Sequence, residues 1–294
     1  MQDGSEGNAR GILSMLGAVL AFALMDAGLK VLSPHYPPMQ VAAMRGLSSL
    51  PLILVWVAVA GGPRQLLRVR WGLHLLRGVL SVVMLASFSY ALRLLPLAEA
   101  YSLFFVAPLL VTALAVPLLG ERVGWRRWLA ILVGLAGTVV VLRPQVGGVL
   151  SLGGIAVLIS ASSYAISAIT VRVLGRTDST LSMVFWMLFM LSGFATLAAW
   201  RDWVAIRPEH WQVLAGLAVS GALGQYGVTE AFRRSPASVI APLEYTALLW
   251  GICLDWYLWN TAPDRIVLLG SGIIILSGLY LLRRGKAHSP AEHP

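Results

Sequence analysis

The sequence predicts an all-α integral membrane bundle of ten transmembrane helices, built from two inverted repeats of five helices each. Three observations lead to this fold class. The chain of 294 residues is 58% hydrophobic and only 12% charged, whereas an ordinary soluble domain has about 25% charged residues. It contains ten apolar windows that are nearly free of charge. Its sequence features also recur at an offset of about 140 residues.

Each apolar window approaches the length of about 20 residues that crosses the bilayer hydrocarbon as a helix. In order, the windows are residues 11–32, 39–60, 71–92, 96–119, 124–142, 149–171, 179–200, 210–232, 236–258 and 264–282. Continuous apolar runs exclude a membrane β-barrel, which needs alternation. A soluble bundle of ten apolar helices would have no polar surface, so we expect the chain to lie in a lipid bilayer.

The ends of the windows carry the usual boundary signals. Short loops separate the windows, and the longest, 61–70 and 201–209, are too short for an inserted domain. Nine of the tryptophans fall near window ends, where interfacial belts form. Prolines interrupt the second window at Pro51, the fourth at Pro108 and Pro117, and the ninth at Pro242. Each is expected to kink its helix, either as part of a gate or cavity wall or as an ordinary membrane-helix kink.

The recurrence divides the chain into two halves. At an offset of 142, Lys30 falls on Arg172, and at an offset of 141, Gly137 falls on Gly278. Five helices is an odd number, so the second copy must lie inverted relative to the first. The expected units are residues 1–145 and 146–285, followed by a disordered cytoplasmic tail, 286–294. Inverted repeats are typical of secondary transporters, whose substrate site lies between the halves near the bilayer midplane.

Basic residues predict the orientation of the chain. Loops on the N-terminal side carry fourteen of them and loops on the opposite side six. Since basic loops stay in the cytoplasm, both termini are expected there, in the inner membrane of a bacterium. The net charge of +9 is spread over many short loops, which indicates contact with lipid headgroups and not a nucleic-acid partner. The expected partners are the bilayer and a small-molecule substrate, and the chain is compatible with a monomer.

Catalytic apparatus is not evident. The five histidines are scattered, and the sequence contains no H-E-x-x-H, G-x-S-x-G or P-loop motif. Cys253 is the single cysteine, which excludes a cysteine metal cluster. We therefore expect no enzyme activity, no metal and no cofactor, and keep an integral-membrane enzyme as the alternative from another class.

Ionisable residues inside the windows are the first candidates for a site, because they are costly to insert into lipid. Asp26 has Lys30 one helical turn away, which favours an intrahelical pair, although Arg45 could reach Asp26 from a neighbouring helix. Arg77 presents a donor fork suited to a carboxylate, or it snorkels to the headgroups or makes a structural pair. Glu244 is expected to face a cavity and to bind a proton or an ammonium group.

Aromatic and hydroxyl side chains form stripes on the fourth, sixth, eighth and ninth windows. Such a lining suits a mid-sized amphiphile or an organic cation, and packing between helices is the other interpretation. The predicted substrate-binding residues are Arg77, Ser81, Tyr101, Phe105, Pro108, Ser163, Tyr164, Gln225, Glu244 and Tyr245.

Several motifs resemble one known family. The first half contains Leu94-Leu95-Pro96-Leu97-Ala98-Glu99-Ala100, then Ala107-Pro108, then Leu119-Gly120-Glu121, then a glycine-containing last window. This order resembles the EamA-type module of the drug/metabolite transporter superfamily. The second half departs from it, with Leu258-Trp259-Asn260 in place of Leu-Gly-Glu. The resemblance implies a ten-helix exporter of amino acids or similar metabolites, with aromatic amino acids favoured, and an efflux carrier for organic cations or drugs as the alternative.

Overall fold

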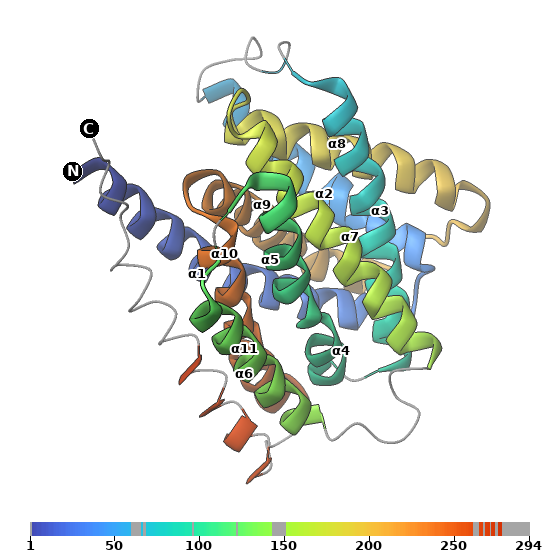
Figure 1. The fold of residues 1–294 in the computed structure, drawn as a ribbon. Helices are drawn as coiled ribbons and strands as arrows, with labels where there is room; N and C mark the ends of the chain where they lie inside the picture. The colour runs from blue at the N-terminus through green and yellow to red at the C-terminus, as the bar shows by residue number, and fades with distance from the viewer. Residues whose placement is uncertain are drawn as a thin grey trace.

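The protein is a bundle of α-helices (Figure 1). The structure is a computed structural model, and it describes residues 2–59, 66, 69–95, 97–121, 123–142 and 151–260, with short pieces between 265 and 277. Over these residues the chain contains only helices and the turns that join them. The prediction of an all-helical membrane bundle is confirmed.

The helices follow the predicted windows closely. Their bounds are α1 Gln2–Leu32, α2 Pro38–Val59, α3 Trp71–Leu94, α4 Leu97–Phe104, α5 Val106–Leu119, α6 Trp125–Leu142, α7 Leu152–Leu174, α8 Thr180–Ala199, α9 Trp211–Arg234, α10 Ala237–Ile240, the 3-10 helix η4 Ala241–Thr246, and α11 Ala247–Trp259. Two one-turn 3-10 helices, η2 Trp200–Asp202 and η3 Pro208–His210, lie between α8 and α9. The tenth window, and the predicted tail after residue 285, fall largely or wholly outside the described residues.

Five helices are long and apolar enough to cross a membrane uninterrupted: Ala9–Leu32, Pro38–Val59, Trp71–Leu94, Leu152–Leu174 and Thr180–Asp202. Two predicted spans are broken. The fourth divides into α4 and α5 at Phe105, and the ninth into α10, η4 and α11. Pro108 and Pro242 explain these breaks, since each lacks an N–H for the helical ladder and its ring clashes with the preceding turn. Pro51 and Pro117, by contrast, lie inside continuous helices.

The two broken spans also end alike. Gly120 caps α5 with φ of 68°, and Asn260 caps α11 with φ of 52°. Among the described residues these are the only two with positive φ. Glycine and asparagine tolerate this left-handed conformation better than other residues do. The two caps are separated by 140 residues, the offset of the repeat.

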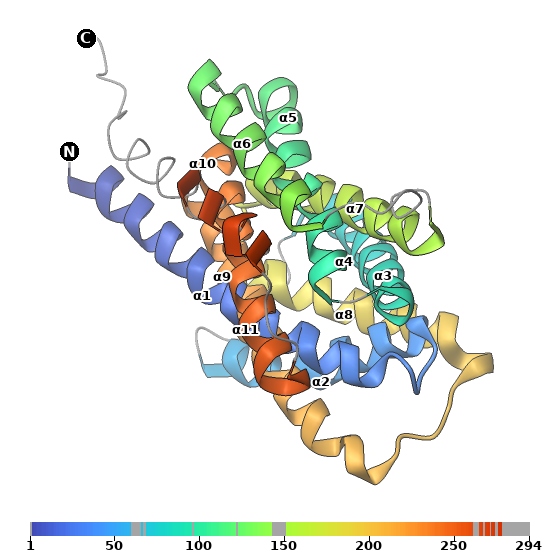
Figure 2. The ribbon, with the colours of Figure 1, turned by 90° about the horizontal axis from the view of Figure 1, so that it is seen from below.

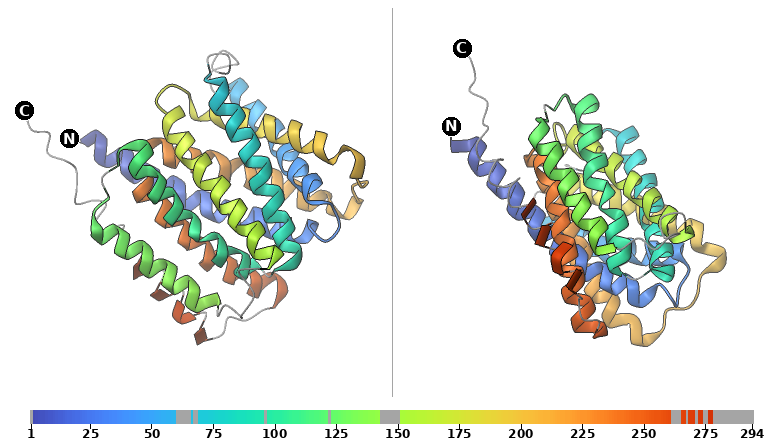
Figure 3. Two further views of the ribbon diagram at one scale, coloured as in Figure 1. Left: turned by 45° about the vertical axis from the view of Figure 1, so that its right-hand side comes forward. Right: turned by 60° about the horizontal axis from the view of Figure 1, so that its bottom comes forward.

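Helix packing follows the repeat as well. The main contacts pair α1 with α9, α3 with α7, and α2 with α8, and Figure 2 shows α1 and α9 side by side. If α1, α2 and α3 correspond to α7, α8 and α9, exchanging the halves turns the α1–α9 pair into the α7–α3 pair. Helices α1 and α7 run in opposite directions (Figure 3). Packing is therefore that of two halves related by an approximate two-fold rotation.

Small residues allow these helices to approach closely. A Cβ on Gly46 would lie 2.6 Å from Ser192 Oγ across the α2–α8 contact. A Cβ on Gly224 of α9 would lie 2.7 Å from the Phe22 ring of α1. Packing of this kind, together with interhelical hydrogen bonds, stabilises helix association in lipid.

Candidate functional site

The main cavity of the described part of the chain lies where the two halves meet. Its empty volume is about 1140 Å³, including the space at its mouth, and helices α1, α2, α3, α4, α7, α8 and α9 line it together with the break of the ninth span. Elements from both repeats therefore supply its wall.

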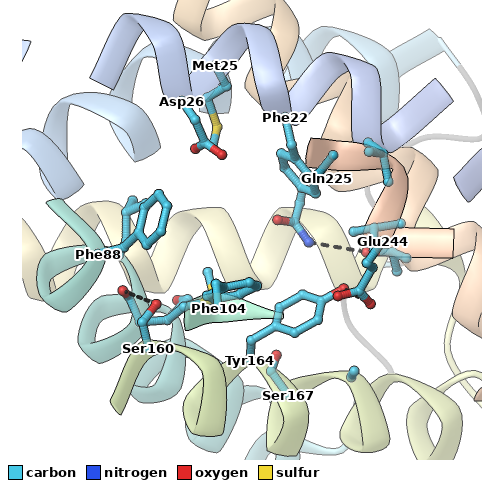
Figure 4. A pocket seen from close by; sticks show the side chains of 18 of the residues that line it. Phe22, Met25, Asp26, Phe88, Phe104, Ser160, Tyr164, Ser167, Gln225 and Glu244 are labelled. Carbon is cyan, nitrogen blue, oxygen red and sulfur yellow. Dashed lines mark hydrogen bonds between the residues drawn. The ribbon is translucent and has the colours of Figure 1, made fainter. Parts of the chain in front are cut away.

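Aromatic rings form one continuous wall of the cavity (Figure 4). Phe104 contacts Phe88 with ring centroids 5.7 Å apart and Tyr164 with centroids 5.6 Å apart. Tyr164 in turn contacts Phe232 at 6.5 Å. These separations are those of favourable edge-on and tilted ring pairs. A flat apolar group can therefore be covered by ring faces and edges in this cavity.

A first polar network surrounds Asp26 of α1. The Tyr101 hydroxyl donates a hydrogen bond to Asp26 Oδ2 at 2.9 Å. Arg45 lies near enough for its positive charge to attract the Asp26 carboxylate. Its Nη2 donates to Gln225 Oε1 at 3.3 Å, and its Nε approaches Met25 Sδ at 3.4 Å. Asp26 and Arg45 thus lie in the same part of the wall, and Arg45 Nη1 has no hydrogen-bond partner among the described residues.

The predicted intrahelical pair of Asp26 with Lys30 is wrong. Lys30 Nζ instead binds Asp255 Oδ1 of α11 at 2.9 Å, and it lies over the Trp259 ring, 4.0 Å from the centroid. The two side chains of α1 separate because Asp26 faces the cavity while Lys30 faces the broken ninth span. The structure thus favours the alternative partner, Arg45.

Arg77 of α3 lies in the cavity wall and is only 1% exposed. Its Nη1 donates to the Met183 carbonyl oxygen at 3.2 Å, its Nη2 lies 3.7 Å from Met187 Sδ, and its Nε lacks a partner. The snorkelling interpretation is therefore wrong. No described carboxylate forms an ion pair with Arg77, whose contacts are neutral.

Glu244 lies within the 3-10 segment that interrupts the ninth span, and it is 7% exposed. It lines the cavity and accepts a hydrogen bond from the Tyr164 hydroxyl at 2.9 Å. Over the described residues no cation pairs with it. Figure 4 places Glu244 across the cavity from Asp26.

Seven of the ten predicted residues line the cavity: Arg77, Ser81, Tyr101, Phe105, Tyr164, Gln225 and Glu244. Three do not. Ser163 is buried, and it lies outside the lining although its neighbour Tyr164 is part of it. Tyr245 turns away from the cavity and packs against Gly134 of α6 and the Phe105 ring. Pro108 is buried at the start of α5, outside the lining.

Sequence reasoning missed several lining residues. Phe22, Phe88 and Thr229 carry no motif, and Asp26 and Arg45 had been assigned other or open roles. The repeat offers a signal for Phe22, because it corresponds to Tyr164 at the offset of 142. A group of three or more histidine, cysteine or acidic residues fit to hold a metal ion is absent from the described residues.

Two of the ion pairs outside the cavity involve the broken spans. One is the Lys30–Asp255 pair, between the end of α1 and α11. The other joins Arg172 Nη2, near the end of α7, to Glu121 Oε1, just after α5, at 3.8 Å. Glu121 Oε1 also accepts from the Ala237 N–H at 3.0 Å, at the start of the ninth span. Lys30 and Arg172 correspond in the repeat, whereas Asp255 and Glu121 are 134 residues apart and do not. Because α1 and α7 run in opposite directions, the two pairs lie at opposite ends of the bundle.

Comparison with known proteins decides the family. Residues 9–143 and 151–283 each match the EamA-like transporter family. The chain belongs to this family. It is 28% identical to the riboflavin transporter of Vibrio cholerae, over 92% of both chains. It is 26% identical to the pseudopaline exporter CntI of Pseudomonas aeruginosa, over 94% of this chain and 97% of that one.

A third relative is the S-adenosylmethionine uptake transporter of Rickettsia prowazekii, 27% identical over all of this chain and 99% of that one. A solved protein structure matches 97% of this EamA-like chain with a TM-score of 0.78 at 19% identity, which shows a shared fold. The protein is accordingly a small-metabolite transporter of the membrane, and the predicted family is confirmed. The relatives are named as transporters and carry different metabolites.

Proposed function

We propose that this protein is a secondary transporter that exports amino acids or similar small metabolites, aromatic amino acids foremost, across the bacterial inner membrane by alternating access. The cavity between the two halves is the observation that carries this proposal. Its wall combines a run of aromatic rings with a small number of polar anchors, as small-molecule sites do. We further propose that both termini lie in the cytoplasm, which the excess of basic residues in the N-terminal-side loops supports.

Alternating access is supported by two ion pairs at opposite ends of the bundle. Lys30–Asp255 fastens one broken span to α1 at one end of the bundle, and Glu121–Arg172 fastens the other broken span to α7 at the opposite end. In the proposed cycle one pair opens while the other holds. Because the two pairs join corresponding helices at opposite ends of the bundle, movement at one end has its counterpart at the other, as in inverted-repeat transporters.

An organic cation is the second candidate substrate. Asp26 and Glu244 are two carboxylates in the cavity wall, and rings attract cations over their faces. Arg45 and Arg77 in the same wall weigh against a substrate that carries only positive charge.

The test is uptake into liposomes that contain the purified protein. Labelled tryptophan, phenylalanine, threonine and an organic cation are offered with and without a pH gradient. Saturable uptake of the aromatic amino acids, competed by their analogues, is the expected result. Uptake of the cation alone would move the protein to the drug-efflux class. No uptake of any of them would refute the proposed substrate class.

A further inference from the structure

Two buried guanidinium groups in the cavity wall each contact a methionine sulfur. Arg45 Nε lies 3.4 Å from Met25 Sδ, and Arg77 Nη2 lies 3.7 Å from Met187 Sδ. All four side chains line the cavity, and the two arginines are 3% and 1% exposed. A thioether is a weak acceptor, whereas a guanidinium always carries its charge. Each arginine is therefore poorly satisfied at this contact.

The two arginines differ in the donors that remain available. A guanidinium has two pairs of parallel donors, Nε with Nη2 and Nη1 with Nη2, so Nη2 belongs to both pairs. In Arg45 the Gln225 amide oxygen accepts from Nη2 at 3.3 Å, and the unpartnered Nη1 alone is not a pair. In Arg77 the Met183 carbonyl oxygen accepts from Nη1 at 3.2 Å, while Nε has no partner. Among the described residues, only the Met187 sulfur occupies the Nε–Nη2 pair of Arg77.

Met187 is suited to give up this contact. Its side chain is unbranched and has three rotatable bonds, and it belongs to the lining of the cavity. A carboxylate accepts from two parallel guanidinium donors with both of its oxygens, and such charge-assisted bonds are stronger than neutral ones. A carboxylate that enters the cavity can therefore displace the sulfur and gain two hydrogen bonds.

We infer that Met187 is a lid over a carboxylate subsite. In this structure its sulfur covers the Nε–Nη2 edge of Arg77, and it is displaced when the carboxylate of the substrate binds there. This inference rests on the proposed function, because an amino acid supplies the carboxylate. A ligand without a strong oxygen acceptor gains nothing from opening the lid, so Met187 is a specificity-determining residue.

The experiment compares tryptophan with tryptamine, which has the same indole and ammonium groups and lacks the carboxylate. Binding to the purified full-length protein is measured by calorimetry. Leucine offers no acceptor to displace, so Met187→Leu should bind tryptophan about 2- to 5-fold more tightly than the wild type does. The amide oxygen of glutamine holds the Arg77 donors firmly, so Met187→Gln should bind tryptophan roughly 10-fold more weakly. The affinity for tryptamine should follow neither change.

Coupling to Arg77 separates the action of a lid from a change in packing. Arg77→Gln should weaken tryptophan binding roughly 10- to 100-fold, and adding Met187→Gln to that variant should cause no further loss. Met25→Leu and Met25→Gln are the matched comparison, because they alter the other contact between a thioether and a guanidinium. They should change the affinities for tryptophan and tryptamine by the same factor.

The failures are distinguishable. Equal losses of tryptophan and tryptamine binding in Met187→Gln, or an effect specific to tryptophan only in the Met25 variants, would overturn the lid while the transport function stands. A wild type that binds tryptamine as tightly as tryptophan would overturn the carboxylate subsite. A wild type that binds neither would overturn this inference together with the proposed substrate class. Size-exclusion profiles that match the wild type establish folding, and Met187→Leu, which nearly conserves volume, carries the test if Met187→Gln does not fold.

Discussion

The pair of His74 and Asp178 gives a sharp stability prediction. His74 Nε2 lies 2.7 Å from Asp178 Oδ2, and the two side chains are 0% and 1% exposed. The pair joins the first turns of α3 to the turn that follows α7, and Asp178 Oδ1 also accepts from Thr177 Oγ1 at 2.6 Å. Removing one partner of such a buried pair generally costs about 3–5 kcal/mol. Asp178→Ala should lower the free energy of unfolding by that amount.

The variant Asp178→Asn removes the negative charge of the side chain while keeping its size and shape. The amide keeps an acceptor near His74, so only the difference between a charged and a neutral hydrogen bond is lost, about 1 kcal/mol. Thermal unfolding in detergent is the assay, at roughly 2 °C per kcal/mol for a chain of this size. Asp178→Ala should therefore lower the midpoint by roughly 6 °C or more, and Asp178→Asn by roughly 2 °C. Equal small shifts for both variants would refute the reasoning.

Tyr36 provides the matched comparison for this pair. At the repeat offset of 142 it corresponds to Asp178, and its hydroxyl lies 2.8 Å from His210 Nδ1 while accepting from the Arg207 N–H at 3.0 Å. The same helix pairing thus uses a neutral hydroxyl at one end and a carboxylate at the other. Tyr36→Phe should cost about 1–3 kcal/mol, the penalty for leaving buried polar groups unpaired.

Three further predictions test packing, gating and the aromatic wall. Gly46→Val should destabilise the protein by about 1–3 kcal/mol in thermal unfolding, because its Cβ meets α8, whereas Gly17→Val, with nothing within 4 Å, should not. Lys30→Asp should slow uptake into liposomes, and the added exchange Asp255→Lys should restore it; a double variant no faster than the single one would contradict the role of this pair. Phe104→Ala should weaken tryptophan binding about 2- to 10-fold in calorimetry while that of threonine changes little.

The sequence was sufficient for the spans and for their breaks. Helix lengths follow from apolar runs, and Pro108 and Pro242 interrupt the ladder in corresponding spans. Pro51 and Pro117 show the limit of the same rule, because neighbouring helices and local adjustments satisfy a membrane helix that contains proline. Whether a proline breaks or merely bends a helix depends on tertiary surroundings that a local pattern does not contain.

For the charged residues, the binding partner was harder to predict from the sequence than whether the side chain is buried. Asp26 and Lys30 have the spacing of a helical pair, yet Lys30 binds Asp255, 225 residues away. An ion pair one turn apart on a helix stabilises it by only about 0.2–0.5 kcal/mol. A partner that is distant in the sequence can therefore replace the local one. Tyr245 lies outside the lining for a related reason, since one step along the chain from Glu244 moves the side chain from the cavity to Gly134 of α6.

The two halves are alike in their helix packing but differ in the side chains that line the cavity. Helix contacts recur at the two ends of the bundle, and the proposed alternating access requires equivalent contacts at each end. Within the cavity, equivalent positions carry different chemistry: Phe22 corresponds to Tyr164, and Phe104 corresponds to Glu244. A substrate with distinct ends has no two-fold symmetry, so a wall that repeated itself would bind it equally well in two orientations. Divergence between the halves is therefore expected to concentrate at the lining, where it gives the substrate a single orientation in a scaffold that remains symmetric.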